Sequence, residues 1–164
     1  MSRGNVAGSG WLLLCRPGFE AECAAEAVAQ WRSRGGGAPH LTRGEGWVRL
    51  RFPRTALEPA GVSFGALVFA RQGCWLVDGI DAQPFVGPQE LLERLPQWLA
   101  AVPGVTEILA EAPDGDAGRR LWPACRSLQG RLEGAVSPAR RGSPVGLRLH
   151  LVLMPTGAVE VGVA

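Results

Sequence analysis

The chemistry that this sequence could perform rests mainly on arginine. All 17 basic residues are Arg, and the chain contains no Lys. Seven of these arginines fall within residues 116–148 against two carboxylates, so this segment carries a net charge of +5 while the remainder sums to −3. A guanidinium can bind two phosphate oxygens at once, and a surface of one charge sign is typical of polyanion binding. Solvated surface arginines or a biased composition would give the same counts.

The arginines of this segment fall at positions that a polyanion could reach. Arg119 and Arg126 are seven residues apart and would project from one face of a helix. Arg140 and Arg141 follow each other in a loop bounded by prolines, which predicts exposure. We expect six arginines of the segment to bind phosphates: Arg119, Arg120, Arg126, Arg140, Arg141 and Arg148.

Other reactive side chains give weaker signals. The cysteines lie at 15, 23, 74 and 125 without a Cys-x-x-Cys pair, and neither His40 nor His150 stands at ligand spacing, so we expect no metal site. A thiol dyad of Cys15 and Cys23 is conceivable, but burial as small apolar residues is favoured. We assign no catalytic residue. Reduced thiols, and the lack of any apolar run near the ~20 residues of a membrane helix, predict a cytoplasmic protein.

The first half of the chain has a recognisable order of elements. An apolar strand at 12–15 meets the turn Arg16-Pro17-Gly18 and passes into a helix whose apolar residues recur every four positions up to Trp31. Residues 40–52 read as two strands around a turn at 43–46, and in the second strand a basic face with Trp47, Arg49 and Arg51 alternates with an apolar face of Val48, Leu50 and Phe52. Residues 62–70 read as a short helix and residues 74–78 as a strand. The order strand, helix, strand, strand, helix, strand predicts a ferredoxin-like unit.

The second half begins after a predicted linker at 81–87. An amphipathic helix is expected over 88–102, kinked or divided at Pro96, followed by a strand over 105–112. The next helix is expected to be capped by Asp114 or Asp116, with Leu121, Cys125, Leu128, Leu132 and Ala135 on its buried face. Pro123 makes that helix begin late or bend. Period-two alternation then predicts a β-hairpin over 145–163, and the fold class is α+β.

Two motifs of the first half also carry a family resemblance. Cys15-Arg-Pro-Gly-Phe-Glu-Ala-Glu-Cys-Ala-Ala-Glu26 and Ser63-Phe-Gly-Ala-Leu-Val-Phe-Ala-Arg-Gln72 resemble the N-terminal region of the bacterial 23S rRNA cytidine 2'-O-ribose methyltransferases. In that family this region is an RNA-binding module with a THUMP domain, and it precedes an S-adenosylmethionine-dependent Rossmann-like catalytic domain. The resemblance adds Arg16 and Arg71 as RNA-binding candidates. Both could instead be structural, tying turns to carboxylates.

The resemblance implies a division of labour within a longer enzyme. It predicts a flexible tail at 1–10, a ferredoxin-like domain at 11–83 and a THUMP-like domain at 84–164, truncated at its C-terminal end. The family's catalytic lysine has no counterpart, because the chain has no Lys, and the Gly-rich loop for S-adenosylmethionine is missing as well. We therefore expect the catalytic domain to lie beyond residue 164. This chain alone should bind 23S rRNA without a cofactor or metal of its own and without catalysis.

Two rival interpretations come from other functional classes. The chain could be a protein-interaction or dimerisation module without RNA binding, with the 145–163 hairpin as an open edge for weak homo-association. It could also be a small independent enzyme that uses Cys15 or Cys23. The RNA element, the oligomeric state and the relative orientation of the two domains are left open by the sequence.

Overall fold

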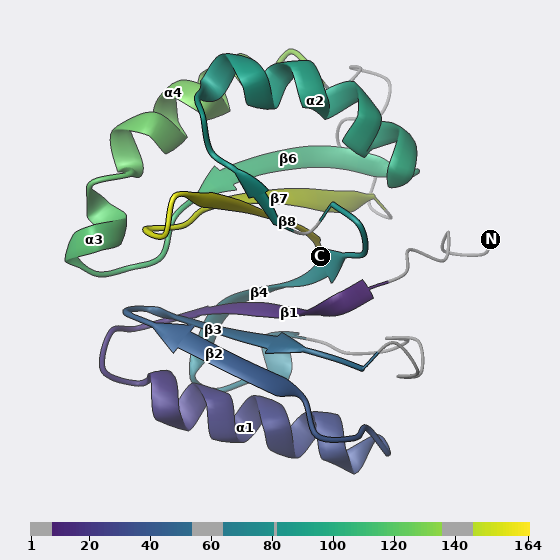
Figure 1. The fold of residues 1–164 in the computed structure, drawn as a ribbon, viewed down its shortest axis with the longest axis vertical. Helices are drawn as coiled ribbons and strands as arrows, with labels where there is room; N and C mark the ends of the chain where they lie inside the picture. Colours follow the sequence, from purple (N-terminus) through teal and green to yellow (C-terminus); the bar gives the residue numbers. More distant parts are fainter. Residues whose placement is uncertain (1–7, 54–63, 81, 136–145) are drawn as a thin grey trace.

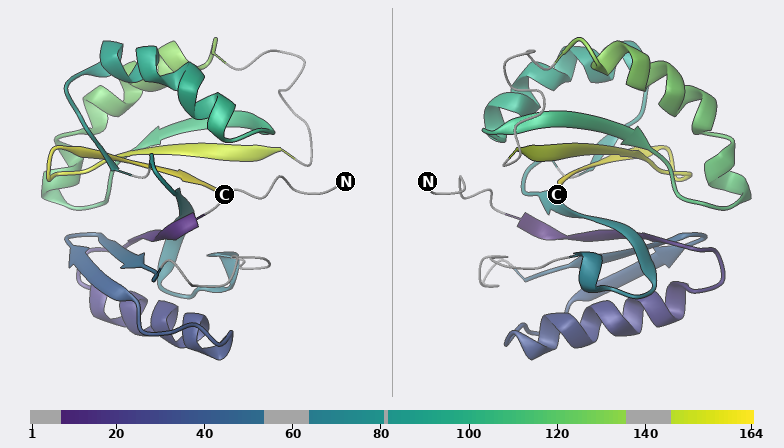
Figure 2. Two further views of the ribbon diagram at one scale, coloured as in Figure 1. Left: turned by 45° about the vertical axis from the view of Figure 1, so that its right-hand side comes forward. Right: turned by 180° about the vertical axis from the view of Figure 1, so that it is seen from behind.

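The computed structural model describes residues 8–53, 64–80, 82–135 and 146–164, which form four layers (Figures 1 and 2). Helix α1 covers one half of a sheet, the second half of the sheet stacks on the first, and helices α2 and α4 cover the far side. The strands form one sheet in the order β2-β3-β1-β4-β8-β7-β6, with β5 paired to β8. The sheet therefore folds over where β4 meets β8, and its two halves face each other.

The first half holds the predicted ferredoxin-like order. Its elements are β1 (Gly8–Cys15), α1 (Glu20–Ser33), β2 (His40–Gly44), β3 (Trp47–Arg51), the 3-10 helix η1 (Phe64–Ala66) and β4 (Ala70–Val77). All of its strand pairs are antiparallel. Trp11 on β1 is fully buried and meets the rings of Trp31, Phe52, Phe64 and Trp75. This aromatic cluster fixes α1 on the sheet.

The second half is an α/β layer. Its elements are β5 (Ala82–Pro84), α2 (Pro88–Ala101), β6 (Val105–Glu111), α3 (Asp116–Arg119), α4 (Trp122–Leu132), β7 (Leu147–Leu153) and β8 (Ala158–Val163). Strands β6 and β7 are parallel, whereas β7 and β8 form the predicted antiparallel hairpin. Trp98 of α2 and Leu128 of α4 belong to one buried apolar cluster with Leu149 and Leu151 of β7. Burial of these large side chains supplies the main driving force for this layer.

A close backbone approach joins the two halves. Trp75 and Leu76 of β4 pair with Val163 and Gly162 of β8. A Cβ at Gly162 would lie 2.5 Å from the Cys74 sulfur, so the strands can approach here only because this residue is glycine. Residues 82–84 of the predicted linker also pair with β8, which makes them part of the sheet.

The space between the two halves has an apolar centre and a polar margin. Leu12, Leu14 and Trp47 of the first half pack with Val152 and Met154 of the second. At one margin Glu160, which is 1% exposed, pairs with Arg49.

Arg51 lies beside the same carboxylate, with a guanidinium nitrogen 3.9 Å from its Oε2. Burial raises the pKa of Glu160, and the charges of Arg49 and Arg51 offset only part of that rise. The basic face predicted for the 47–51 strand therefore points into the molecule.

Several local expectations were wrong. The last strand of the first half starts at Ala70, because its backbone already pairs with β1 there, Ala70 opposite Cys15 and Gln72 opposite Leu14, and the 62–70 helix shortens to η1 in the described residues. Pro96 lies inside α2 without dividing it, and Ala135 is exposed beyond the end of α4. The expectation for Pro123 is confirmed in its first alternative, because α4 begins late, at Trp122, with Pro123 in its first turn.

The 145–163 hairpin has no open edge in the described structure, because β7 lies between β6 and β8 and β8 also pairs with β4 and β5. The open edge expected for this hairpin is therefore contradicted, whereas weak homo-association itself stays a prediction.

Candidate functional site

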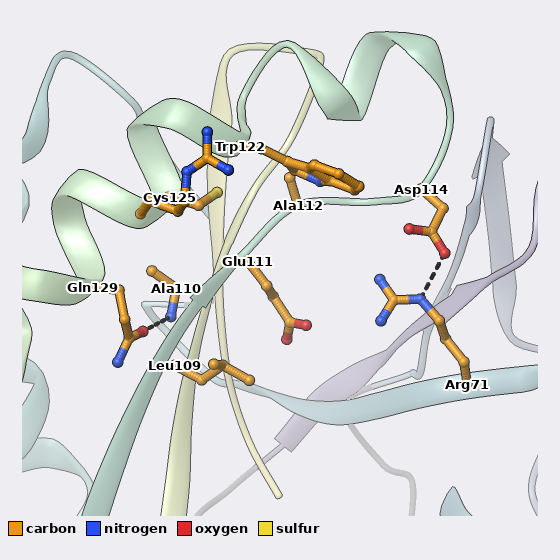
Figure 3. Close-up of a pocket in the computed structure, with 10 residues that line it drawn as sticks. Arg71, Leu109, Ala110, Glu111, Ala112, Asp114, Trp122, Cys125 and Gln129 are labelled. Carbon is orange, nitrogen blue, oxygen red and sulfur yellow. Dashed lines mark hydrogen bonds and ion pairs between the residues drawn. The ribbon is translucent and has the colours of Figure 1, made fainter.

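A pocket of about 360 Å³ lies at the C-terminal end of β6, between α4 and the start of β4 (Figure 3). It joins residues of both halves of the molecule. Its lining consists of Arg71, Leu109, Ala110, Glu111, Ala112, Asp114, Trp122, Cys125, Arg126 and Gln129.

Helix α4 forms one wall of the pocket. Trp122, Arg126 and Gln129 follow one another at helical spacing and so share a face. The Gln129 side chain accepts the Ala110 N–H at 2.8 Å and donates to the Ile108 carbonyl at 3.1 Å. Because β6 is an edge strand, these bonds satisfy its open edge and fix α4 against it. Trp122 is 41% exposed, and Arg126 is exposed and forms no ion pair with the described residues.

Glu111 is the most constrained polar group of the pocket. Its Oε1 accepts a hydrogen bond from Gln72 at 2.9 Å and lies 2.6 Å from Nδ1 of His150, which is 1% exposed. Since a carboxylate oxygen accepts, Nδ1 carries the proton of this short contact. Gln72 comes from β4 and His150 from β7, so three strands hold the carboxylate in one orientation.

An ion pair forms the opposite rim. The Nε of Arg71 lies 2.8 Å from Oδ2 of Asp114, and the two side chains are 39% and 32% exposed. Figure 3 shows the Arg71 guanidinium and the Glu111 carboxylate turned toward the same space. Nε is one of five N–H donors of a guanidinium, so this bond orients Arg71 without using up its capacity to bind an anion.

The tip of the β2–β3 hairpin positions Asp114 and α3. The N–H of Gly46 donates to Glu20 at 2.8 Å, and its φ of +79° is one that glycine tolerates. A Cβ at Gly46 would lie 2.2 Å from the Asp114 carbonyl oxygen, so no larger residue fits there. The Glu45 carboxylate accepts the Ala117 N–H at 3.5 Å, close to the start of α3.

The predicted arginines are not all at one place. Arg71 and Arg126 line the pocket, Arg119 and Arg120 are exposed on and just after α3, and Arg16 is exposed after β1. The β1–α1 turn, the start of β4 and α3 lie at the same end of the molecule (Figure 1). These five arginines therefore share one end.

The remaining predicted arginines are elsewhere. Arg148 stands at the start of β7, near the opposite end of the strands, and its Nε donates to Glu107 at 2.8 Å. Arg119 also has a carboxylate near it, Asp116 at 3.6 Å. Arg140 and Arg141 lie outside the described residues.

Sequence reasoning missed Trp122, Glu111 and their supports Gln72, His150 and Gln129. The spacing of Trp122, Arg126 and Gln129 was a readable signal. The contacts of Glu111 were not readable, because they join strands distant in sequence.

The cysteine thiols are poorly placed for catalysis. Cys15 and Cys23 are 0% and 1% exposed, and although a hydrogen bond from Cys23 lowers the pKa of Cys15, neither sulfur is accessible. Burial, followed by the charge of Glu111, raises the pKa of Cys125 to about 11, so this pocket residue stays a neutral thiol. Within the described residues no group of His, Cys, Asp and Glu could hold a metal ion. None of the described helices is long and apolar enough to cross a bilayer.

Comparison with known proteins gives concordant matches. Residues 9–74 match the model of the RlmM ferredoxin-like domain. The ribosomal RNA large subunit methyltransferase M of Alkalilimnicola ehrlichii is 36% identical over 166 residues, which cover 94% of this chain and 42% of that protein. The protein of the same name from Xanthomonas axonopodis pv. citri is 31% identical over 157 residues, covering 89% and 43%. This chain thus spans about two-fifths of the length of these relatives.

A solved structure shares the fold. A protein of Listeria monocytogenes described as a predicted N6-adenine-specific DNA methylase superposes with a TM-score of 0.52 at 12% identity, over 96% of this chain and 40% of that chain. At this identity the likeness concerns the fold alone. The sequence matches show that this chain corresponds to the N-terminal region of the ribosomal RNA large subunit methyltransferase M family, with the ferredoxin-like domain at residues 9–74.

Proposed function

We propose that this chain is the RNA-binding part of a cytoplasmic, S-adenosylmethionine-dependent 23S rRNA (cytidine-2'-O-)-methyltransferase. It would recruit and orient rRNA for ribose methylation by a further domain of the whole enzyme. The names of the relatives and their greater length support this proposal. We also keep residues 11–83 as its ferredoxin-like domain and residues 84–164 as its THUMP-like domain.

The gathering of arginines around the pocket is the observation that carries the RNA-binding role. Arg16, Arg119, Arg120 and Arg126 are exposed at the end of the molecule where Arg71 lines the pocket. Folded RNA is bound largely through phosphates and 2'-hydroxyls, for which clustered guanidiniums on a rigid support suffice. The RNA would reach Arg148 only if it extended along the second half of the molecule to the start of β7. The same extension would be needed for Arg140 and Arg141 to take part.

S-adenosylmethionine does not fit the turns of this chain that most resemble a cofactor loop. After β1, the Gly18 N–H donates to the carboxylate of Glu20, which also accepts the Gly46 N–H. After β6, the Ala117 N–H is directed at Glu45. The chain's own carboxylates thus accept the N–H groups of these turns, and the sequence has no Lys to serve as the family's catalytic lysine. We expect no methyl transfer by this chain alone.

Salt-dependent binding tests the proposal. Labelled fragments of 23S rRNA are titrated with the chain by fluorescence anisotropy over a series of salt concentrations. The double variant Arg119→Ala/Arg120→Ala should lower the slope of log K against log [salt] by about 2, since each lost phosphate contact removes roughly 0.9. Its matched control, Arg32→Ala/Arg34→Ala, removes two exposed arginines from around the end of α1 and should leave the slope unchanged. Equal slopes in both variants, or binding that ignores salt, would contradict RNA binding by this surface.

A further inference from the structure

We propose that the pocket holds one unpaired nucleotide of the RNA, with its base stacked on Trp122 and hydrogen-bonded to Glu111 and its phosphate on the arginine rim. This inference rests on the proposed function, because it assumes that RNA is the ligand. It goes further in assigning a single-nucleotide site, with a preference for bases that carry an exocyclic amino group.

Trp122 is the first support for a base at this position. An indole left 41% exposed at the mouth of a pocket offers an apolar face that water solvates poorly. Nucleic acid bases stack on such faces with little dependence on their identity. A base inside a duplex has both faces covered, so only an unpaired base could stack here.

The distribution of charge is the second support. Arg126 lies one helical turn from Trp122 on the same face of α4, and Arg71 faces the pocket from β4. Glu111 and Asp114 line the same pocket. A small free anion would be repelled by these two carboxylates. A nucleotide instead separates its phosphate from its base, so the phosphate can stay on the rim while neutral N–H donors reach Glu111.

The orientation of Glu111 gives the base preference. Oε1 is engaged by Gln72 and His150, whereas Oε2 takes no hydrogen bond from the described residues and the side chain is 12% exposed. A fixed carboxylate oxygen facing the pocket accepts from amino groups, which adenine, cytosine and guanine carry and uracil lacks. Cytosine and uracil have rings of the same size and differ at one exocyclic group, an amine in place of a carbonyl. They are therefore the best matched pair of probes.

The volume sets the number of nucleotides. A pocket of about 360 Å³ lies at the small end of the ~300–1,000 Å³ that ligand sites occupy. This volume suits one nucleotide. The neighbouring nucleotides of the RNA would lie outside the pocket, on the surface around Arg119 and Arg120.

The test uses the full chain and two labelled RNA hexanucleotides, oligo(C) and oligo(U), with binding measured by fluorescence anisotropy at low salt. The wild type should bind oligo(C) more tightly than oligo(U). Trp122→Ala should weaken binding of both about tenfold, while Trp122→Phe should keep most of the affinity. Phe69→Ala removes another exposed aromatic side chain, one that stacks on Phe19 and does not line the pocket, and should leave the affinity for both hexanucleotides close to that of the wild type.

Glu111→Gln separates base recognition from stacking. It should abolish the preference for oligo(C) while the binding of oligo(U) stays at its wild-type level, with circular dichroism and the melting temperature confirming that the variant is folded. If the wild type binds rRNA fragments while Trp122→Ala and Phe69→Ala behave alike, or Glu111→Gln keeps the preference, the nucleotide site is refuted and the proposed function stands. If the wild type binds neither rRNA nor hexanucleotides, both are refuted.

Discussion

Two pairs of arginines in this molecule have the same chemistry and opposite surroundings. Arg49 and Arg51 project from β3 into the space between the halves of the sheet, beside the buried carboxylate of Glu160. Arg71 and Arg126 line an open pocket, where Arg71 has the partly exposed Asp114 and Arg126 has no carboxylate partner among the described residues. The first pair neutralises a buried charge, whereas the second leaves positive charge accessible.

The difference teaches that the partner of a guanidinium decides its role. A buried carboxylate must be matched by a cation, since an unpaired charge in the interior costs several kcal/mol. Arg49 and Arg51 are therefore needed by the fold, and their side chains, 25% and 30% exposed, have little left to offer a ligand. An exposed guanidinium adds little to stability, so its charge remains available for phosphates. Four variants test this contrast.

The largest effect is expected when Glu160 loses its carboxylate. Glu160→Ala leaves Arg49 and Arg51 facing the interior without the carboxylate charge that both lie beside and should lower the free energy of unfolding by about 3 kcal/mol. Urea titration followed by circular dichroism measures the loss. The RNA affinity of the folded variant should stay at the wild-type level. A loss below about 0.5 kcal/mol would show that the pair does not support the fold.

The same contrast explains how far sequence reasoning reached. The alternation of residues 47–52 correctly predicted a strand with one basic face, because period two is a local property. It could not predict that the basic face points inward, since Glu160 lies 111 residues away from Arg49. The ferredoxin-like order was predicted in the same local way. The extension of its last strand back to Ala70 was missed, because the residues that pair with it, Leu14 and Cys15 of β1, lie far away in the sequence.

The pocket was only partly predictable for a related reason. Arg71 and Arg126 were candidates from the sequence, but nothing local indicated that β4 and α4 meet. Trp122 was overlooked beside Pro123, which was considered only as a helix breaker although it lies in the first turn of α4. Long-range pairing of strands, rather than local propensity, assembles this site.

The next largest effect is expected at Arg126, one of the two arginines that line the open pocket, and it concerns RNA binding rather than stability. Arg126→Ala should weaken rRNA binding severalfold and lower the salt slope by about 1, because one phosphate contact is lost. Its unfolding free energy should stay within about 0.5 kcal/mol of the wild type. Arg131→Ala removes the same charge from the same helix outside the pocket and is the matched control. Identical salt slopes in the two variants would place Arg126 outside the interface.

A smaller effect should appear in the pH dependence of stability. Burial raises the pKa of Glu160 in the folded chain above its ordinary value of 4.5, so the folded state holds this proton more tightly than the unfolded state. The stability that Glu160 contributes is then full below pH 4.5 and is lost as the pH rises through the raised pKa. Glu160→Gln keeps an acceptor oxygen for Arg49 and does not titrate. Its unfolding free energy, relative to wild type, should increase from pH 4 to pH 7, and a flat or opposite trend would contradict this.

The smallest effect concerns the ion pair that restrains Arg71. Asp114→Asn removes a partly exposed carboxylate, so the cost in stability should stay below about 1 kcal/mol. Because the negative charge beside Arg71 is gone, RNA affinity should rise about twofold. In the double variant Arg71→Ala/Asp114→Asn that gain should shrink, since the freed guanidinium is absent, and this coupling is measured as a double-mutant cycle of binding free energies. A gain that persists without Arg71 would mean that Asp114 repels RNA by its own charge. Arg71 would then contribute little to RNA binding, and its main role would be the ion pair with Asp114.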